Sequence, residues 1–534
     1  MKAFTKISLA MASGLMMAAA WPTRGFTPLI FIAFIPLLYL QDISGDPDNK
    51  KKGNIFLLSF LAFFIWNTLT TYWVWNSTAA GAIAMLILNS TFMATVFWAY
   101  HFVKKKLYGN KKGYFMLPVF FVAFEYLHLN WQLNWPWLNI SNVFSHQHTW
   151  IQWYEYTGSA GGTIWVLASN IIIYKLFKAA FIDKTDKKSI IKKGMAVILV
   201  IAIPIITSLI IYNNYKEEGE DIEVVVIQPN IDPYTEEFTL SPLQIMERNI
   251  PLADSIVTEK TLFVLSPESA IQEALWIHAP GNSISVKKLK AFDERHPECA
   301  YIIGASTFSI VPAGMEDDFA ARAVYLNQKE KSYIYAHNTA LMVTKDTIDH
   351  YHKSKLTPGV EQMPSWWFLR PLERLAIDLG GTSGTLKGED NAHVFEHNGI
   401  KAAALICYES AFGNYVIDFV REGADILFVI TNDGWWGNTP GHRQHLELSK
   451  LRAIETRRSI ARSANTGISA YINQRGDIIE KTQYEEPAAL RNTLKSNDKQ
   501  TFYVRYGNYL YTASVFITII MLSVCLVFIV TRKK

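Results

Sequence analysis

Three segments of the sequence each place one chemically active side chain directly after a probable strand. Cys407 follows the apolar run Ala402 to Ile406, which is too short for a helix and predicts a buried strand. Glu268 and Lys353 close two further segments of the same kind. A thiol where a strand gives way to a helix lies at a sheet edge beside backbone N–H groups, which suits a nucleophile. A lone cysteine is more often a core residue, but the carboxylate and the ammonium group favour the catalytic interpretation.

These three residue types are suited to acyl transfer through a thioester. A free thiol with a pKa of ~8.5 is only a few per cent ionised at pH 7, so Cys407 needs a base. Glu268 is the candidate base, and later the proton donor to the leaving group. The Lys353 ammonium would stabilise the thiolate and the oxyanion of the tetrahedral intermediate, together with the backbone N–H of Tyr408.

The motifs around these residues resemble the nitrilase superfamily and, within it, the apolipoprotein N-acyltransferase family. The motifs are P-E-S-A at Pro267 to Ala270, Y-x-K-x-x-L-x-P-x-x-E at Tyr351 to Glu361, C-Y-E at Cys407 to Glu409, and T-N-D-G-W-W-G at Thr431 to Gly437. The resemblance runs from residue 222 to about residue 485, and the apolar segments around it extend it to most of the chain.

Two positions depart from the family pattern. The chain has Pro358-Gly359-Val360-Glu361 where the family usually has Pro-Phe-Gly-Glu. A family tryptophan expected near residue 237 is missing, and Tyr234 and Phe238 are the nearest aromatic residues.

The resemblance implies a fold, a reaction and further site residues. The fold would be a multi-pass helical membrane domain with an α/β nitrilase-like domain, a four-layer αββα sandwich. The donor would be a phospholipid in the bilayer and the acceptor a diacylated apolipoprotein, with no metal or organic cofactor. The resemblance also implies that Glu361 holds Lys353 and that Glu409 orients groups beside the nucleophile, with Tyr408 and Trp435 as support for the substrate or the oxyanion.

Two other functions remain open at this point. One is a membrane-anchored nitrilase-type amidase, in which water attacks the thioester. The other is a transporter or scaffold with an inactive nitrilase-like domain, which the intact Glu268, Lys353 and Cys407 argue against.

The composition indicates a membrane protein with one sizeable soluble domain. Half of the 534 residues are hydrophobic, and 16 are tryptophan. The net charge is only +4, and the lysines cluster between apolar segments. Nucleic acid binding is therefore excluded.

Eight apolar segments are candidate membrane spans, several of them close to the ~20 residues that a bilayer requires. They cover residues 7–20, 26–40, 54–75, 79–102, 115–131, 162–181, 194–212 and 508–531. The first segment could instead be a cleaved signal peptide, although the resemblance favours its retention.

Lysine and arginine in alternate loops predict the orientation. They gather at Lys50 to Lys52, Lys104 to Lys112, Lys184 to Lys193 and Arg532 to Lys534, which we expect in the cytoplasm. The expected organisation is a membrane domain with seven helices (1–212), a linker (213–221), an exported catalytic domain (222–496), a second linker (497–507) and a last membrane helix (508–531). The resemblance then places the chain in the bacterial inner membrane with a periplasmic catalytic domain.

Three further segments have alternative interpretations. The aromatic-rich loop 132–161 is typical of an interfacial belt, or it packs under the soluble domain and lines a path for lipid. A helix over Arg443 to Arg462 is expected to present a solvated basic face that pairs with Glu447 and Glu455, and contact with lipid phosphate is the alternative. Trp366, Trp367 and Phe368 are expected to form an arm that dips into the outer leaflet beside the active site.

Overall fold

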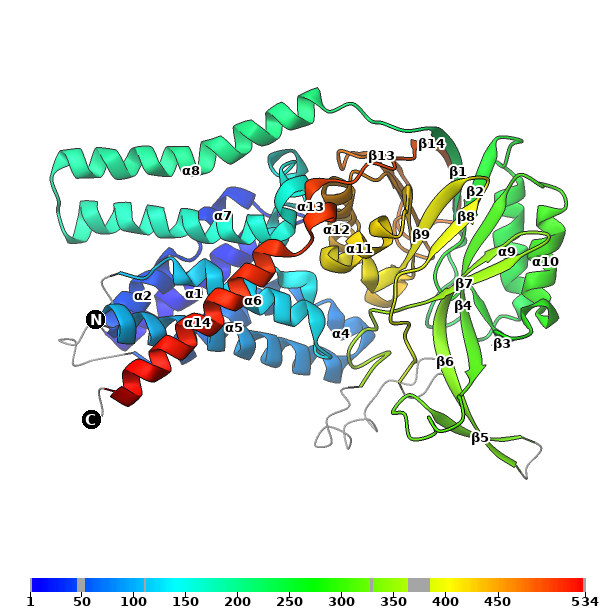
Figure 1. The fold of residues 1–534 in the computed structure, drawn as a ribbon, viewed down its shortest axis with the longest axis horizontal. Coiled ribbons are helices and arrows are strands. Elements are labelled where there is room, and N and C mark those ends of the chain that lie inside the picture. The colour runs from blue at the N-terminus through cyan, green and yellow to red at the C-terminus, as the bar shows by residue number, and fades with distance from the viewer. Residues whose placement is uncertain (1, 46–52, 110–111, 327–329, 364–384, 532–534) are drawn as a thin grey trace.

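The computed structural model describes residues 2–45, 53–109, 112–326, 330–363 and 385–531. Two parts are visible in them (Figure 1): a bundle of long helices that includes both ends of the chain, and a pair of β-sheets with their own helices.

A helix forms at each of the eight apolar segments. These helices are α1 (Ala3–Ala20), α2 (Ile35–Gly45, preceded by the short helix η1, Thr27–Phe31), α3 (Ile55–Thr71), α5 (Ala79–Tyr108), α6 (Met116–Asn130), α7 (Tyr154–Phe177), α8 (Lys187–Asn214) and α14 (Tyr509–Thr531). Within the described ranges six helical segments are long and apolar enough to cross a membrane, and α3 and α6 are shorter apolar helices. The chain is therefore a membrane protein.

The first sheet, as far as the described residues show, has eight strands in the order β14-β1-β2-β4-β6-β5, with β3 beside β4 and β7 beside β6. Their bounds are β1 Asp221–Gln228, β2 Thr261–Leu265, β3 Ile271–Trp276, β4 Ala300–Ile310, β5 Arg322–Leu326, β6 Glu330–Val343, β7 Ile348–His352 and β14 Ala488–Lys495. The neighbours β1, β2 and β4 run parallel, so the side chain that follows β2 lies at the carboxyl edge of these strands.

The second sheet, in the same described ranges, has six strands in the order β13-β12-β11-β10-β9-β8. Their bounds are β8 Val394–His397, β9 Ile400–Ile406, β10 Ile426–Thr431, β11 Ile460–Ala464, β12 Ala470–Ile472 and β13 Ile478–Lys481. The central strands β9, β10 and β11 are parallel and buried, which fits their continuous apolar runs.

The sheets pack face to face between two layers of helices, which confirms the αββα sandwich. Along β1, Val224 and Val226 belong to the core between the sheets, whereas Val225 and Ile227 belong to the core under the outer helices α9 (Pro242–Asp254) and α10 (Ile284–Asp293). This alternation follows from the two-residue period of a strand. Phe263 on β2 meets Phe428 on β10 with ring centroids 5.1 Å apart across the two sheets.

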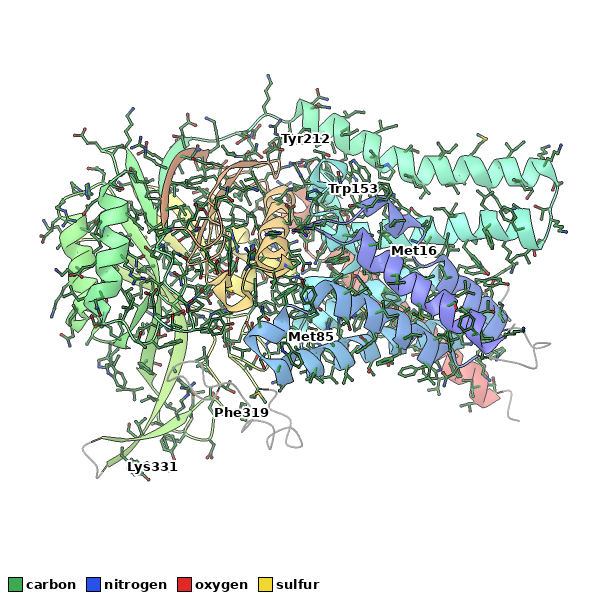
Figure 2. The ribbon with its side chains drawn as sticks, turned by 180° about the vertical axis from the view of Figure 1, so that it is seen from behind. Met16, Met85, Trp153, Tyr212, Phe319 and Lys331 are labelled. Atoms are coloured by element: carbon green, nitrogen blue, oxygen red, sulfur yellow. The ribbon has the colours of Figure 1, made fainter. Side chains whose placement is uncertain are left out.

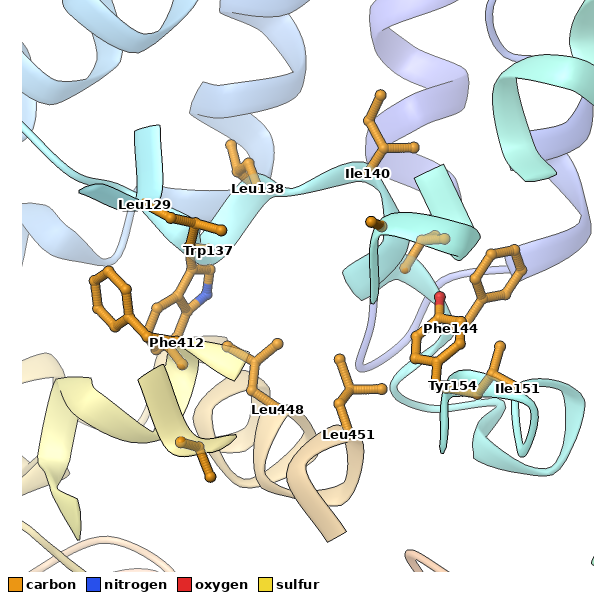
Figure 3. Packing of buried hydrophobic residues seen from close by; sticks show 14 of the residues in the cluster. Leu129, Trp137, Leu138, Ile140, Phe144, Ile151, Tyr154, Phe412, Leu448 and Leu451 are labelled. Atoms are coloured by element: carbon orange, nitrogen blue, oxygen red, sulfur yellow. The ribbon is translucent and has the colours of Figure 1, made fainter. Parts of the chain in front are cut away.

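The second sheet is covered by α11 (Gly413–Arg421) and α12 (Pro440–Thr456), and α12 also packs against the membrane part. Figure 3 shows Leu448 and Leu451 of α12 facing apolar residues of the membrane part. Polar contacts join the same surfaces: Trp137 Nε1 donates to Gln444 Oε1 at 2.8 Å, and Arg457 Nε donates to Glu155 Oε2 at 2.8 Å.

The expected helix over Arg443 to Arg462 with a solvated face is wrong in two respects. The helix ends at Thr456, because Arg457 adopts a left-handed conformation (φ 52°), and Arg462 lies on β11. Arg452 and Arg462 are buried. Arg462 donates to Asp433 and to the carbonyl oxygen of Ile468 inside the catalytic domain.

The aromatic loop between α6 and α7 packs under the catalytic domain, as the alternative interpretation expected. Trp137 is 2% exposed and packs edge-on against Trp436 and at a tilt against His445 of that domain, with ring centroids 5.5 Å apart in both cases. Trp135 and Trp137 therefore do not form an interfacial belt.

Two residue ranges expected as linkers contain regular structure. Strand β1 already begins at Asp221, and a short helix, α13 (Phe502–Tyr506), lies between β14 and α14. Tyr503 of α13 is buried at the junction of the two parts.

Candidate active site

Cys407 lies where β9 ends and the short helix η8 (Cys407–Ala411) begins. Its φ angle is +50°, a conformation that non-glycine residues rarely adopt and that is found at functional turns. Two donors hold its carbonyl oxygen: Ser410 Oγ at 2.8 Å and His445 Nε2 at 3.1 Å. The backbone around the thiol is therefore fixed by neighbouring side chains.

Glu268 and Lys353 lie together beside Cys407 in one cavity of about 150 Å³. Lys353 follows β7, and its Nζ donates to Glu268 Oε1 at 3.1 Å. Glu268 follows β2, and its Oε2 accepts from the backbone N–H of Asn432 at 3.1 Å. The structure thus brings together three residues that are up to 139 positions apart, 407 − 268.

Glu361 holds Lys353 from the other side. Its carboxylate accepts from Lys353 Nζ at 2.9 Å, and the backbone N–H of Thr357 donates to it at 2.9 Å. Asn338 Nδ2 donates to both Glu268 Oε1 and Glu361 Oε1, each at 2.8 Å. The turn that carries Glu361 contains Gly359 at φ +79°, one position before the glycine of the family pattern.

The charges around the thiol set its resting state. Burial raises the pKa of Cys407 and the Glu268 carboxylate raises it further, while Lys353 only partly offsets them. Burial lowers the pKa of Lys353, but the carboxylates of Glu268 and Glu361 outweigh it and the net pKa is well above the usual range. The resting site therefore holds a neutral thiol beside a permanent ammonium group, and the thiol needs a base to react.

Comparison with known proteins gives two family matches. Residues 13–172 match the apolipoprotein N-acyltransferase N-terminal domain, and residues 310–498 match the carbon-nitrogen hydrolase family, so that each part of the fold has a match. The apolipoprotein N-acyltransferase of Chlorobaculum tepidum is 26% identical over 93% of this chain and 92% of its own length.

The chain belongs to the apolipoprotein N-acyltransferase family. The family member from Geobacter metallireducens is 25% identical over 94% of this chain and 91% of its own length. A solved member of branch 10 of the nitrilase superfamily from Saccharomyces cerevisiae, 15% identical, covers 53% of this chain and 92% of its own with a TM-score of 0.37.

Glu409 of the acyltransferase is buried next to Cys407 but does not line the cavity. It accepts from Tyr351 Oη at 2.6 Å and from the backbone N–H groups of Ser354 and Ile406, each at 2.8 Å. One buried carboxylate thus ties the segment after β7 to the end of β9. This geometry supports the orienting role that the sequence predicts for Glu409.

Tyr408 and Trp435 lie on different sides of Cys407. Tyr408 points toward the membrane part, where its hydroxyl donates to the carbonyl oxygen of Asn134 at 3.0 Å. Trp435 lines the active-site cavity and packs against Tyr234 and Phe238, with ring centroids 5.2 and 6.2 Å away. Aromatic cover is therefore present where the family tryptophan is missing.

Several residues of this site were missed in the sequence. Asn338 lies on β6 and has no local pattern that distinguishes it from other polar strand residues. Asn432 belongs to the T-N-D-G-W-W-G motif, so that motif could have indicated it. Glu237, a buried carboxyl on the cavity wall, follows β1 in a segment whose neighbours are exposed. The predicted arm residues Trp366, Trp367 and Phe368 lie outside the described residues.

Proposed function

We propose that this acyltransferase moves an acyl chain from a membrane phospholipid to Cys407 and then to the α-amino group of a diacylated apolipoprotein. The product is a triacylated lipoprotein. The names of the relatives give lipoproteins as the acceptor class, and the site offers the groups that both half-reactions need.

A second cavity is the observation that supports a lipid as the acyl donor. It has a volume of about 260 Å³, is bounded mainly by apolar side chains, and is lined by Cys407 and Tyr408 at one end. Its wall includes Met85 and Leu88 of α5; Figure 2 shows Met85 on the membrane part near the two sheets. Cys407 thus borders both the cavity that holds Glu268, Lys353 and Glu361 and an apolar cavity along a membrane helix, which fits an ester whose acyl chain stays in apolar surroundings.

The first half-reaction uses Glu268 as the base. Glu268 takes the proton from the Cys407 thiol, and the thiolate attacks the ester carbonyl of the phospholipid. The Lys353 ammonium, aided by the backbone N–H of Tyr408, stabilises the oxyanion. The intermediate collapses to the thioester, and the leaving lysophospholipid oxygen takes the proton back from Glu268.

The second half-reaction reverses these roles. An uncharged amine attacks the thioester carbonyl, and Glu268 takes a proton from the attacking nitrogen and returns it to Sγ of Cys407. The amidase alternative, in which water attacks, is not favoured, because the named relatives are N-acyltransferases. A small amide substrate also has no acyl chain that would fill the apolar cavity.

The proposal includes a location. The lysine-rich loops before α3, after α5 and before α8 alternate with loops that have few cations, and this pattern favours a cytoplasmic position for both chain ends. The catalytic domain then lies on the outer side of the bacterial inner membrane.

The test is a single incubation of the membrane-embedded protein with phospholipid that has a radiolabelled acyl chain. Label that stays on the protein and is released by hydroxylamine is expected for the wild type and for Cys299→Ala, since Cys299 is a buried cysteine just before β4 and does not line the cavity. Cys407→Ala should carry no label. A hydroxylamine-sensitive label on Cys407→Ala, or none on the wild type, would overturn the proposal.

Filling the apolar cavity should separate long from short donors. Ala84 of α5 lines that cavity, so Ala84→Trp should slow thioester formation from a long-chain phospholipid by about ten-fold, while a short-chain soluble ester reacts nearly as before. The control is Ile83→Trp, since the neighbouring Ile83 is exposed and does not line the cavity. Equal rates for Ala84→Trp and the wild type on the long-chain donor would show that the acyl chain lies elsewhere.

A further inference from the structure

Glu237 is a buried carboxyl group on the wall of the active-site cavity that the two half-reactions above leave unused. It is 5% exposed, whereas Tyr234 and Phe238 in the same segment are 55% and 40% exposed. Burying a carboxylate costs free energy, because the charge loses its water. The side chain of Glu237 therefore faces the cavity despite a cost in folding free energy, which suggests that it has a function there.

The contacts of Glu237 connect it to the proposed base. Asn432 Nδ2 donates to Glu237 Oε2 at 2.6 Å, and the backbone N–H of the same asparagine donates to Glu268 Oε2. Gln272 Nε2 makes a longer contact of 3.4 Å with Glu237 Oε1. One residue thus fixes both carboxyl groups on the same wall.

Glu237 has no cationic partner among the residues that the structure describes. In the ranges that the structure describes, no lysine, arginine or histidine forms an ion pair with it, and Lys353 pairs with Glu268 and Glu361. Asn338 Oδ1, which is buried and lines the same cavity, has no hydrogen-bond partner among the described residues. The cavity therefore offers an unpaired carboxyl group and an unpaired acceptor to an incoming N–H group.

The reaction needs a proton acceptor that Glu268 does not provide. An α-amino group has a pKa of about 7.7 to 8.0, so most of it is an ammonium ion at pH 7 and cannot attack. It must lose one proton before it attacks and a second proton as the amide forms. Glu268 accounts for the second proton, which it passes to the Cys407 sulfur.

We propose that Glu237 binds the ammonium group of the acyl acceptor and takes its first proton, so that an uncharged amine faces the thioester. This inference rests on the proposed function. The bound ammonium displaces the proton of Glu237 to water, and the ion pair then transfers one ammonium proton to the carboxylate. The amine forms the N–C bond as the S–C bond breaks, so the cycle releases one proton to water and leaves Glu237 neutral again.

The environment of Glu237 suits this exchange. Burial raises the pKa of Glu237 to about 8, and the negative charges of Glu268 and Asp232 also raise it. The hydrogen bonds from Asn432 and Gln272 lower the pKa but do not offset these causes. This pKa matches that of an α-amino group, so a proton can pass between them at little cost.

The experiment compares the half-reactions in the full-length membrane protein with Glu237→Gln. Glutamine keeps an oxygen for Asn432 but cannot take a proton. The rate of thioester formation should stay within about two-fold of wild type. Transfer to a diacylated lipopeptide at pH 7 should slow by about 10²-fold, which is the lower end of the rate loss expected when a general base is removed. The control is Glu236→Gln, since Glu236 pairs with Arg248 outside the cavity.

Hydroxylamine separates a chemical role from a structural one. It is already uncharged at pH 7, so it should cleave the thioester of Glu237→Gln and of the wild type at equal rates. Equal slowing with hydroxylamine and the lipopeptide, or normal transfer to the lipopeptide, would overturn the inference.

A further experiment varies the phospholipid donor, because its head group is another possible source of the ammonium group. Vesicles of phosphatidylethanolamine and of phosphatidylglycerol should acylate Glu237→Gln equally well relative to wild type. A loss confined to phosphatidylethanolamine would mean that Glu237 binds the donor, which would also overturn the inference. The proposed function fails separately, if the wild type forms no thioester from either lipid.

Discussion

Glu268→Gln should slow the formation of the Cys407 thioester by about 10²- to 10⁴-fold, the range for loss of a general base. The amide still accepts from Lys353 and Asn338, which both meet Oε1 in the wild type. It cannot take the thiol proton, and the pKa of the buried Cys407 is already raised, so the thiolate does not form without a base. The measurement is the rate of label incorporation in a single turnover.

Iodoacetamide gives an independent measure of the same effect. Alkylation of Cys407 also needs the thiolate, so it should slow in Glu268→Gln together with acylation. Label incorporation at the wild-type rate would mean that a different residue is the base.

Lys353→Arg should lower acylation by about 10²- to 10³-fold even though the positive charge remains. The ammonium is 2% exposed and fits between Glu268 and Glu361 at 3.1 and 2.9 Å. A planar guanidinium is wider, so it displaces these carboxylates and moves its charge away from the position of the oxyanion. Overpacking of this kind also costs about 1–3 kcal/mol of stability.

Lys355→Arg provides the matched control for that variant. Lys355 lies two residues further on, outside the cavity, with its ammonium 4.9 Å from the centre of the Tyr415 ring, a contact that arginine can also make. The Lys355→Arg variant should therefore acylate Cys407 at the wild-type rate. Activity of Lys353→Arg within a few-fold of wild type would show that only the long-range charge at this position matters.

The sequence predicts well what depends on local pattern. Residues 403–406 and 426–430 are continuous apolar runs, and they form the buried parallel strands β9 and β10. The apolar run before Cys407 predicts its place at the end of a strand, and the structure adds the φ angle of +50°. The apolar segments likewise predict the helices of the membrane part.

Contacts between distant segments could not be predicted in this way. The basic residues at 452–462 look like a solvated face because the sequence does not show their distant partners. Arg457 meets Glu155 of the membrane part, whereas Arg458 and Arg462 are bonded inside the catalytic domain. Asn432 meets Glu237 across 195 positions, and nothing near either residue indicates the other. Such pairs arise when strands from separate sheets place their carboxyl ends together.

The burial of α12 between the second sheet and the membrane part has a consequence for proteolysis. A cut in the segment between α8 and β1 would leave the catalytic domain attached to the bundle, because α14 continues from the domain and packs against α6, and because Leu448, Leu451 and the ion pair of Arg457 with Glu155 remain in place. Release would uncover the apolar side of the helix and leave buried charges without partners. Protease nicking should therefore give two fragments that stay together through purification in mild detergent.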